Sequence, residues 1–173
     1  MTWIVSHKAD PAARAIADRH YNRQHVGAPQ FVPPGRALVL LSRVGRAFWI
    51  TSWPFAEYVR HRWAGAWVCS AFRNEGAGLS SELIREALAA SRAHFGGRPI
   101  ISTPRGPVTM VTFVDASKVR HKRDPGRCYL RAGFERDGET KGGLLAFVLR
   151  PENCPEPVAP LTQQLDFTER FAS

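Results

Sequence analysis

A glycine-containing turn between a buried strand and an amphipathic helix is the sequence feature that most constrains the fold. The apolar run at residues 66–72 is typical of a buried strand, and it leads into Arg73-Asn74-Glu75-Gly76-Ala77-Gly78. From Leu79 onward apolar residues recur with a period near 3.6, which predicts a helix with one buried stripe that ends near Gly96. Glycines let a backbone approach a ligand closely, and the free N–H groups at a helix start favour an anion. The turn therefore predicts an anion site, although a plain glycine turn into a core helix has the same pattern.

The spacing within the turn narrows the kind of anion site. No Lys-Ser or Lys-Thr pair follows Gly78, so the turn is not a P-loop, and the three-glycine dinucleotide pattern is also missing. The pattern Arg-x-x-Gly-x-Gly resembles the pyrophosphate loop of the GCN5-related N-acetyltransferases (the GNAT superfamily). This resemblance implies that Gly76, Ala77 and Gly78 bind the pyrophosphate of acetyl-CoA or a related acyl donor. Arg73 would add a charge-assisted contact, unless it is only a solvated strand end.

The remaining segments predict a single layered domain. A first helix is expected from Pro11 to about His20, with Asp10 as its N-cap, and a last short helix is expected near residues 124–132. The strand-like segments are residues 2–6, 37–43, 46–53, 66–72, 99–103, 108–114, 134–140 and 143–149. This order predicts an α+β (α/β layered) fold with about six or seven strands. It is also the order of the GNAT fold, which implies a mixed, mostly antiparallel central sheet flanked by helices.

A second motif lies near the other end of the chain. Arg127-Cys128-Tyr129-Leu130-Arg131-Ala132-Gly133-Phe134 resembles the GNAT segment in which a short helix carries Tyr-x-x-x-Gly-Phe before a strand. In that family the tyrosine often protonates the departing thiolate of coenzyme A, and the resemblance implies this role for Tyr129. A tyrosine hydroxyl with a pKa near 10 keeps its proton at neutral pH and can donate it to a developing thiolate.

Two segments depart from an ordinary GNAT sequence. One is an insertion at about residues 104–123, and the other is His20-Tyr21-Asn22-Arg23, which a proline-rich loop follows. With residues 124–129 and Gly138-x-Thr140-Lys141-Gly142-Gly143-Leu144, they resemble the phage Mom-type DNA-modification proteins. Those proteins are GNAT-like and install a carbamoylmethyl group on the exocyclic amine of adenine. The resemblance implies a phage enzyme that modifies adenine in double-stranded DNA, so that the DNA evades restriction.

Such a reaction needs a group that takes a proton from the adenine amine, whose lone pair is delocalised into the ring. Asp124, His20 and Asp115 are the candidates for this base, and Tyr21 is a candidate for stacking on an extruded base. Asp124 can equally be an N-cap of the short helix, and His20 can equally cap the end of the first helix. Tyr21 can equally belong to the core. His20 and Tyr21 with a carboxylate could also bind iron, but no recognisable ligand spacing is present, and we predict no metal site.

The charge of the chain indicates a polyanionic partner. Its 24 Lys and Arg residues exceed its 15 Asp and Glu residues, which gives a formal net charge of +9. Nucleic acid is the usual partner of such a surplus, although a basic protein from a GC-rich genome has the same composition. The basic cluster predicted to contact DNA phosphates consists of Lys118, Arg120, Lys122, Arg123 and Arg127. Such a run is also common in a solvated loop.

A target base in duplex DNA must leave the stack before it can react. Trp49, Trp53 and Phe55 are the aromatic side chains that can line a pocket for it, although they can equally belong to the core. No apolar run approaches the roughly 18 residues of a membrane span, and the N-terminus does not resemble a signal peptide. The three cysteines are widely spaced and form no CxxC motif, which favours a reducing cytoplasm.

The length of 173 residues is that of one domain. We expect a catalytic domain at residues 1–150 and a proline-rich tail at residues 151–173, which packs on the domain or on a second subunit of a homodimer. The sequence favours a DNA-modifying transferase that uses a small-molecule acyl donor. One alternative is an acetyl-CoA-dependent N-acetyltransferase acting on a small amine or a protein. The other is a catalytically silent nucleic-acid-binding protein that keeps the fold.

Overall fold

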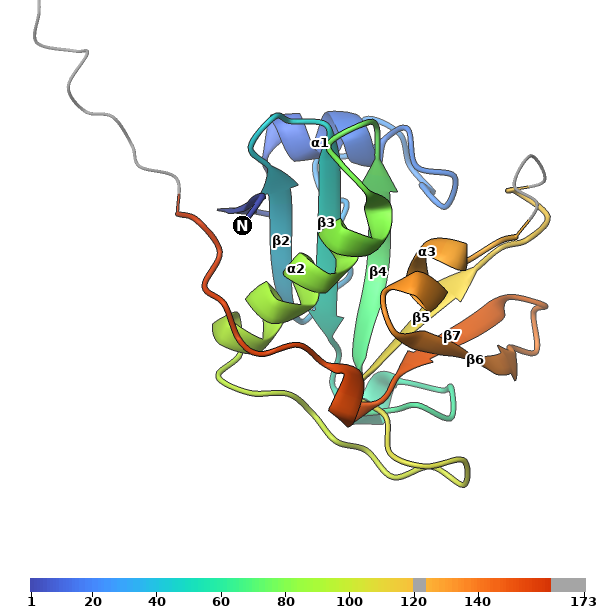
Figure 1. The fold of residues 1–173 in the computed structure, drawn as a ribbon. Coiled ribbons are helices and arrows are strands. Elements are labelled where there is room, and N and C mark those ends of the chain that lie inside the picture. The colour runs from blue at the N-terminus through green and yellow to red at the C-terminus, as the bar shows by residue number, and fades with distance from the viewer. Residues whose placement is uncertain (120–123, 163–173) are drawn as a thin grey trace, which may run out of the picture.

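The computed structural model describes residues 1–119 and 124–162 (Figure 1). Within these residues the strands are β1 (Trp3–Ser6), β2 (Arg36–Ser42), β3 (Ala47–Trp53), β4 (Trp67–Asn74), β5 (Met110–Val114), β6 (Phe134–Glu139) and β7 (Leu145–Leu149). The helices are α1 (Pro11–Ala17), α2 (Ser80–His94) and α3 (Arg127–Arg131), with the short 3-10 turns η1 (Ala56–Tyr58) and η2 (Pro151–Asn153).

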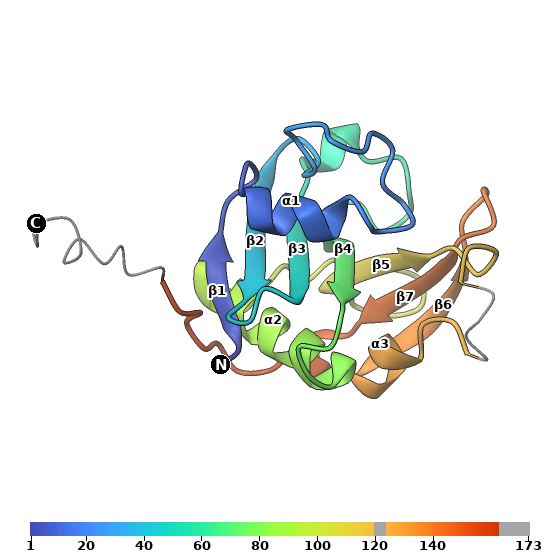
Figure 2. The same ribbon diagram turned by 90° about the horizontal axis from the view of Figure 1, so that it is seen from above.

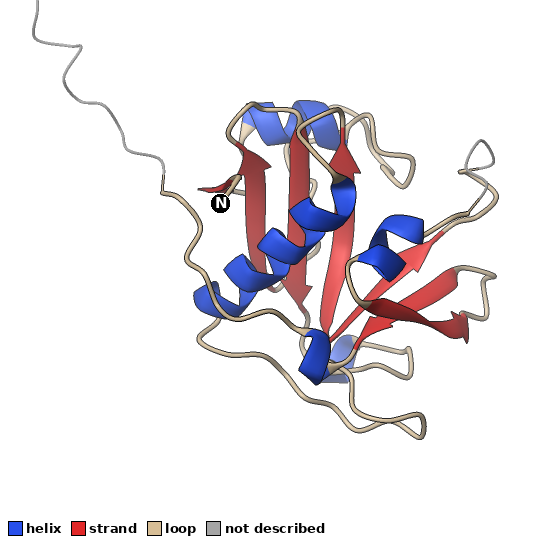
Figure 3. Ribbon diagram, viewed as in Figure 1, coloured by secondary structure: helices blue, strands red, loops and turns tan. Residues whose placement is uncertain are grey.

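The seven strands of the described chain form one mixed sheet in the order β1-β2-β3-β4-β5-β7-β6. Strand β4 runs parallel to β5, and the other neighbouring strands are antiparallel. The predicted α+β fold, with a mixed and mostly antiparallel sheet of six or seven strands flanked by helices, is confirmed (Figure 3).

The parallel pair β4 and β5 is joined over only a short length. Their register runs from Trp67 opposite Met110 to Cys69 opposite Thr112, whereas β4 continues to Asn74. Beyond Cys69 the two strands diverge, and α3 packs beside the point of divergence (Figure 1). The second half of β4 therefore has no partner strand of the described chain on the β5 side. Helix α3 and the loop after α1 lie near this unpaired part of its main chain.

The helices cover both faces of the sheet. Figure 2 shows α1 on one side of β2 and β3, and α2 on the other side. The main core lies between the sheet and the helices α2 and α3, and it includes the fully buried Trp3, Trp49 and Trp67. A smaller core under α1 contains Ile16, Phe48 and Ile50. A third core beside β5 and β7 is built around Trp63.

Helix α1 begins where the sequence predicts and ends one turn earlier. The Asp10 carboxylate accepts a hydrogen bond from the Ala12 N–H at 2.8 Å, and proline occupies the first turn. The prediction that the helix extends to about His20 is wrong. After Ala17 the backbone hydrogen bonds span three residues instead of four, and the His20 N–H donates to the Ala17 C=O at 2.9 Å. His20 thereby leaves the helix and faces β4.

The expected strand at residues 99–103 is also wrong. Only a single bridge, between Ile101 and Val108, is present there. Pro99, Pro104 and Pro107 supply no N–H groups, so this stretch cannot sustain a ladder. The following strand accordingly begins at Met110.

The described part of the tail lies along the domain. The Val158 N–H donates a hydrogen bond to the Ala89 C=O of α2 at 3.2 Å. Leu161 pairs with β1: its N–H donates to the Trp3 C=O at 3.0 Å, and its C=O accepts from the Val5 N–H at 2.9 Å. Residues 163–173 lie outside the described part. No helix of residues 1–119 and 124–162 is both long enough and apolar enough to cross a lipid bilayer.

Candidate active site

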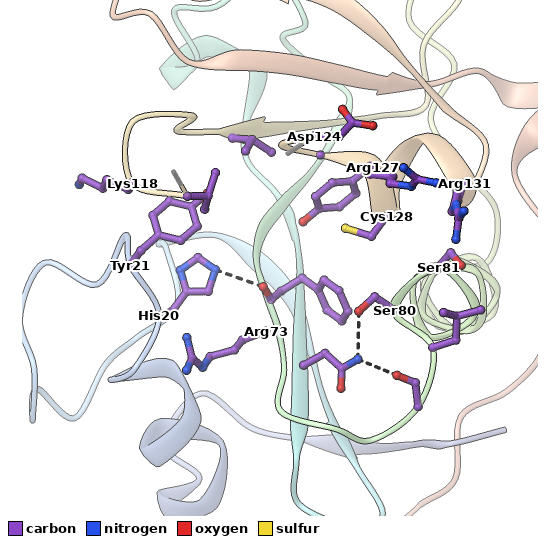
Figure 4. A pocket seen from close by; sticks show the side chains of 18 residues that line it. His20, Tyr21, Arg73, Ser80, Ser81, Lys118, Asp124, Arg127, Cys128 and Arg131 are labelled. Atoms are coloured by element: carbon purple, nitrogen blue, oxygen red, sulfur yellow. Dashed lines mark hydrogen bonds between the residues drawn. The ribbon is translucent and has the colours of Figure 1, made fainter. Parts of the chain in front are cut away.

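An open cleft of about 840 Å³ lies where β4 and β5 diverge (Figure 4). Its walls come from the loop after α1, the end of β4, the start of α2, the end of β5 and helix α3. The residues that line it are His20, Tyr21, Phe72, Arg73, Asn74, Gly78, Leu79, Ser80, Ser81, Val114, Lys118, Val119, Asp124, Gly126, Arg127, Cys128, Tyr129 and Arg131.

The cleft brings together most of the residues that the sequence singled out. Four candidate catalytic residues line it with four predicted binding residues, namely His20, Tyr21, Asp124, Tyr129, Arg73, Gly78, Lys118 and Arg127. Gly76 and Ala77 belong to the same turn but do not line the cleft. The predicted phosphate contacts Arg120, Lys122 and Arg123 lie outside the described residues.

The His20 ring is held from both of its nitrogens. Nε2 lies 3.1 Å from the main-chain oxygen of Phe72, and Nδ1 contacts the side-chain oxygen of Asn22. Because a carbonyl oxygen only accepts, Nε2 carries the proton. Burial lowers the pKa of His20, whereas its two hydrogen bonds act in the opposite direction. Because Asn22 holds one ring nitrogen and Phe72 the other, His20 anchors the loop to β4.

Tyr21 lies in the cleft next to His20. Its ring stacks on that of His20 with a centroid separation of 4.6 Å and an interplanar angle of 27°. Burial raises the pKa of its hydroxyl, so Tyr21 remains neutral at physiological pH. Figure 4 shows the ring between His20 and the segment that carries Lys118. A flat, neutral ring on a fixed neighbour is suited to stacking against another planar group.

Tyr129 comes from α3 and lies on the buried side of the cleft. Its hydroxyl oxygen is 3.7 Å from the sulfur of Cys69 on β4. Burial raises the pKa of Tyr129 well above its ordinary value, and it raises the pKa of the Cys69 thiol to about 12. Both groups therefore hold their protons at neutral pH. Tyr129 is placed as a hydrogen-bond donor, and burial makes it a weaker acid than a free tyrosine.

The two candidate carboxylates differ in their availability. Asp124 is exposed at the rim of the cleft, and in Figure 4 its carboxylate points away from His20 and Tyr21. It is not the N-cap of α3, because that helix begins after Gly126. Asp115 accepts hydrogen bonds from Ser117, which lower its pKa, and it does not line the cleft. Asp124 is thus the acidic residue among the described residues that line the cleft.

Asn74 fixes the shape of the glycine turn. Its side-chain oxygen accepts from the N–H groups of Gly76 and Ala77 at 3.1 and 2.8 Å. Its amide nitrogen donates to the Gly78 carbonyl and to the Ser80 hydroxyl at 2.8 and 3.0 Å. The N–H groups of Gly76 and Ala77, which the resemblance assigns to a pyrophosphate, are therefore already bonded within the turn.

The N–H groups that follow in the chain have no such partners. Helix α2 has no side-chain cap, and within the described residues no acceptor is found for the N–H groups of Gly78, Leu79, Ser80 and Ser81. Gly78 has a backbone φ of 148°, a conformation that residues other than glycine rarely adopt. The start of this 15-residue helix therefore offers N–H groups of the kind that bind anions, and Gly78 is the one residue of the predicted pyrophosphate turn Gly76–Gly78 that is among them.

Arg73 is committed to an ion pair beside the turn. Its Nε donates to the Glu75 carboxylate at 2.7 Å, and Arg19 donates to the same carboxylate at 2.8 and 2.6 Å. Arg19 and Arg73 together lower the pKa of Glu75 to about 2. An anion in the cleft would compete with Glu75 for Arg73.

Helix α3 supplies two further cations. Arg127 and Arg131 are four residues apart, so they share one face of the helix, and neither forms an ion pair with a described residue. Figure 4 shows both side chains on the side of the cleft where Ser81 lies in the first turn of α2. Sequence reasoning missed Arg131 and Asn74. The spacing of Arg131 from Arg127 was a usable signal, whereas the role of Asn74 depends on the shape of the turn.

The first residues of α2, with Arg127 and Arg131, are the groups of the cleft that would hold a pyrophosphate. No group of three His, Cys, Asp or Glu residues in the described chain is placed to hold a metal ion, and both nitrogens of His20 are engaged. The iron alternative therefore has no ligand set among these residues.

The aromatic residues proposed for a base pocket lie elsewhere. Trp49 is fully buried in the main core. Trp53 and Phe55 line a separate, smaller pocket at the other end of β3. Comparison of the chain with protein-family models, curated proteins and solved structures finds no match.

Proposed function

We propose that the protein is a DNA-modifying transferase of the GNAT type that acts on the exocyclic amine of adenine. The transferred group is of the carbamoylmethyl kind that the resemblance implies. One observation carries the proposal. A single cleft contains an uncapped helix start beside two arginines that form no ion pair with a described residue, and it faces a stacked His20–Tyr21 pair.

The order of the elements supports the assignment to this fold. Strand β4 leads through the glycine turn into α2, and the tyrosine helix α3 leads into the final hairpin. These are the two motifs on which the resemblance rests, and they meet at one cleft although about 50 residues separate them. Convergence of two distant motifs on one site is what a shared function requires.

The two sides of the cleft suit two different ligands. The α2–α3 side offers backbone N–H groups and guanidinium groups, which favour the phosphates of an acyl donor. The opposite side offers the ring of Tyr21, which can stack on an adenine that has left the duplex. A donor and a base bound in this way would meet near Tyr129.

The reaction requires one proton transfer and stabilisation of the leaving group. As the CH2 carbon of the carbamoylmethyl group forms its bond to the adenine nitrogen, that nitrogen loses a proton, and the bond between the CH2 carbon and the leaving group breaks, with its electron pair going to the leaving group. We assign acceptance of the proton to Asp124, the acidic residue among the described residues that line the cleft, whose exposed carboxylate would have to turn toward the adenine from its position in Figure 4. Tyr129 would donate a hydrogen bond to the leaving group, because its raised pKa keeps the hydroxyl protonated.

The DNA contacts follow from charge. Lys118 lines the cleft, and its Nζ is 3.9 Å from Asp115, too far for a strong ion pair. Phosphate contacts by Lys118 and by the neighbouring basic residues would make binding fall as salt is raised.

Nucleoside mass spectrometry of plasmid DNA from cells that express the protein tests the proposal. An adenosine of increased mass should appear with the intact chain and be reduced or lost with Asp124→Ala and Tyr129→Phe. Unmodified DNA together with binding of acetyl-CoA would favour the N-acetyltransferase alternative. Unmodified DNA together with unchanged DNA affinity in Tyr129→Phe would favour the silent binding protein.

A further inference from the structure

A second pocket, of about 210 Å³, lies at the opposite end of β3 and β4 from the glycine turn. Its lining residues are Arg36, Trp53, Pro54, Phe55, Ala56 and Gly65, and none of them lines the main cleft. The connection between β3 and β4 forms much of it, and this connection is found at the lower end of those strands in Figure 1.

The base of this pocket is a fixed aromatic group. Trp53 Nε1 donates to the Gly65 carbonyl at 3.1 Å. The Trp53 ring also meets the rings of Trp67 and Phe95 edge to face, with centroids 6.1 and 5.5 Å apart. A ring held at its nitrogen and by two neighbouring rings has little freedom to move, so it presents a preorganised surface.

The guanidinium group of Arg36 lies over this aromatic base. Its guanidinium carbon is 4.7 Å from the centroid of Trp53 and 5.4 Å from that of Phe95. Arg36 is exposed and forms no ion pair with a described residue. His94 is a titratable neighbour of Arg36, and burial together with the charge of Arg36 lowers its pKa. Because the Arg36 side chain is exposed, its guanidinium group is accessible to a ligand.

Phe55 completes the pocket from the other side. It is 59% exposed and meets the 77% exposed Tyr58 edge to face at 6.4 Å. Two neighbouring aromatic side chains left this exposed are costly unless a partner covers them. Arg60 follows two residues after Tyr58, so Arg36 and Arg60 outnumber Glu57 among the charged residues at the pocket and in the neighbouring part of the β3–β4 connection.

These features select the chemistry of the ligand. A cationic ligand is disfavoured, because Arg36 already lies over Trp53. A planar π-system can stack on the guanidinium plane and against Phe55, as nucleobases stack on arginine and aromatic side chains. The pocket is smaller than the roughly 300–1,000 Å³ that enclose a whole small ligand. It therefore fits one planar unit of a longer, negatively charged molecule.

We propose that Arg36, Trp53 and Phe55 form a stacking site for one unpaired base of a nucleic-acid strand. The site is independent of the transfer reaction and lies about 25 Å from the glycine turn, since β4 has eight residues at about 3.3 Å each. It would bind the strand away from the main cleft, and it contributes affinity rather than chemistry.

The test is the affinity of the full chain for a fluorescent twelve-nucleotide oligothymidine, measured by anisotropy. Phe55→Leu keeps an apolar side chain but removes the aromatic ring. Arg36→Lys keeps the positive charge but removes the planar guanidinium group. Each should weaken binding by at least about fivefold, the lower end of what one stacking contact contributes. Phe55→Trp should bind within about twofold of the unchanged protein.

Two exposed residues at the β2–β3 turn provide matched controls, since they lie at the other end of β3. Val44→Ala and Arg43→Lys should leave the affinity within about twofold, and circular dichroism should show that every variant is folded. Equal affinity for the unchanged protein, Phe55→Leu and Arg36→Lys would overturn the proposal, as would absence of oligothymidine binding. Thymidine monophosphate that bound as tightly as the strand would assign the pocket to free nucleotides and overturn the strand site.

The oligothymidine affinities test the stacking site independently of the DNA modification that tests the proposed function. Unmodified cellular DNA with the expected pattern of oligothymidine affinities would contradict the transferase and leave the stacking site standing. Modified adenine with unchanged affinities in Phe55→Leu and Arg36→Lys would do the reverse.

Discussion

The hydroxyl oxygen of Tyr129 lies 3.7 Å from the sulfur of Cys69, where α3 packs against β4. Neither side chain is more than 8% exposed, and burial raises the pKa of both. Tyr129, to which we assign assistance of the leaving group in the proposed reaction, is therefore a firmly protonated phenol at neutral pH. Its protonation state gives a measurable signature.

We predict that the protein loses stability in alkali through Tyr129. A folded-state pKa above the unfolded value near 10 means that the unfolded chain releases its proton first. The free energy of unfolding should be unaffected by Tyr129 below pH 10 and should fall as the pH rises beyond it. Urea denaturation between pH 8 and pH 11 measures this. Tyr129→Phe should flatten the decline, and a decline as steep as that of the unchanged protein would contradict the prediction.

Glu75 should stabilise the protein in neutral solution and not in acid. Arg19 and Arg73 depress its pKa from 4.5 to about 2, so its contribution is present above about pH 4.5 and disappears as the pH falls toward 2. Glu75→Gln should lower the free energy of unfolding at pH 7 by about 0.5–1 kcal/mol, because the arginines are partly exposed and solvent screens the pair. Denaturation at pH 7 and pH 2.5 checks this, and an equal loss at both would refute it.

Asn74→Ala should disable the cleft while the fold remains. The substitution removes four hydrogen bonds that shape the turn, and it leaves the Gly76 and Ala77 N–H groups without their acceptor. We expect a loss of about 1–2 kcal/mol in stability and at least a tenfold loss of transfer activity. Asn153→Ala, which removes a single bond to the Gly133 carbonyl, is the control and should keep its activity. Retained activity in Asn74→Ala would show that the shape of the turn is unimportant.

Arg127 and Arg131 should bind pyrophosphate together with the start of α2. We expect the double substitution Arg127→Ala with Arg131→Ala to weaken inorganic pyrophosphate binding by about tenfold or more, measured by isothermal titration calorimetry. Arg136→Ala with Arg92→Ala removes the same charge from residues that are ion-paired elsewhere, and it should have a small effect. Equal losses in the two double variants would indicate nonspecific attraction by net charge.

Gly126→Ala should be among the most damaging substitutions near the site. Gly126 has φ of 86°, and a Cβ atom there would overlap the ring of Phe147 in the core. We expect a loss of about 3 kcal/mol or more, from strain in the backbone and overpacking together. Gly45→Ala has a comparable φ of 64° with nothing near its Cβ, so it should cost about 1–2 kcal/mol. Thermal denaturation compares the two, and equal losses would mean that the ring of Phe147 yields.

The sequence predicted the elements whose signals are local. The buried run before Arg73 and the 3.6-residue period after it correctly placed β4 and α2. The end of α1 was missed because the departure of His20 depends on its contact with Phe72, which is distant in the chain. The strand at residues 99–103 was predicted from apolar content, although its prolines could not supply the ladder.

The candidate site was predictable as a set of residues but not as an arrangement. Both motifs contribute to the cleft, and the histidine and tyrosine of the first loop join them. The conformation of the turn determines which N–H groups are engaged. Asn74 accepts hydrogen bonds from the N–H groups of Gly76 and Ala77, and the N–H groups without an acceptor among the described residues begin at Gly78. Likewise, only the folded chain separates Trp49 in the core from Trp53 in a second pocket.

The most direct test of the transferase is the mass of the adenine nucleosides in DNA from cells that express it. The account predicts an adenosine with added mass when the chain is intact, a much smaller amount with Asp124→Ala or Tyr129→Phe, and an undiminished amount with the control Asn153→Ala. The mass difference would also identify the transferred group. DNA with only ordinary nucleosides, from cells in which the folded protein is abundant, would contradict the account.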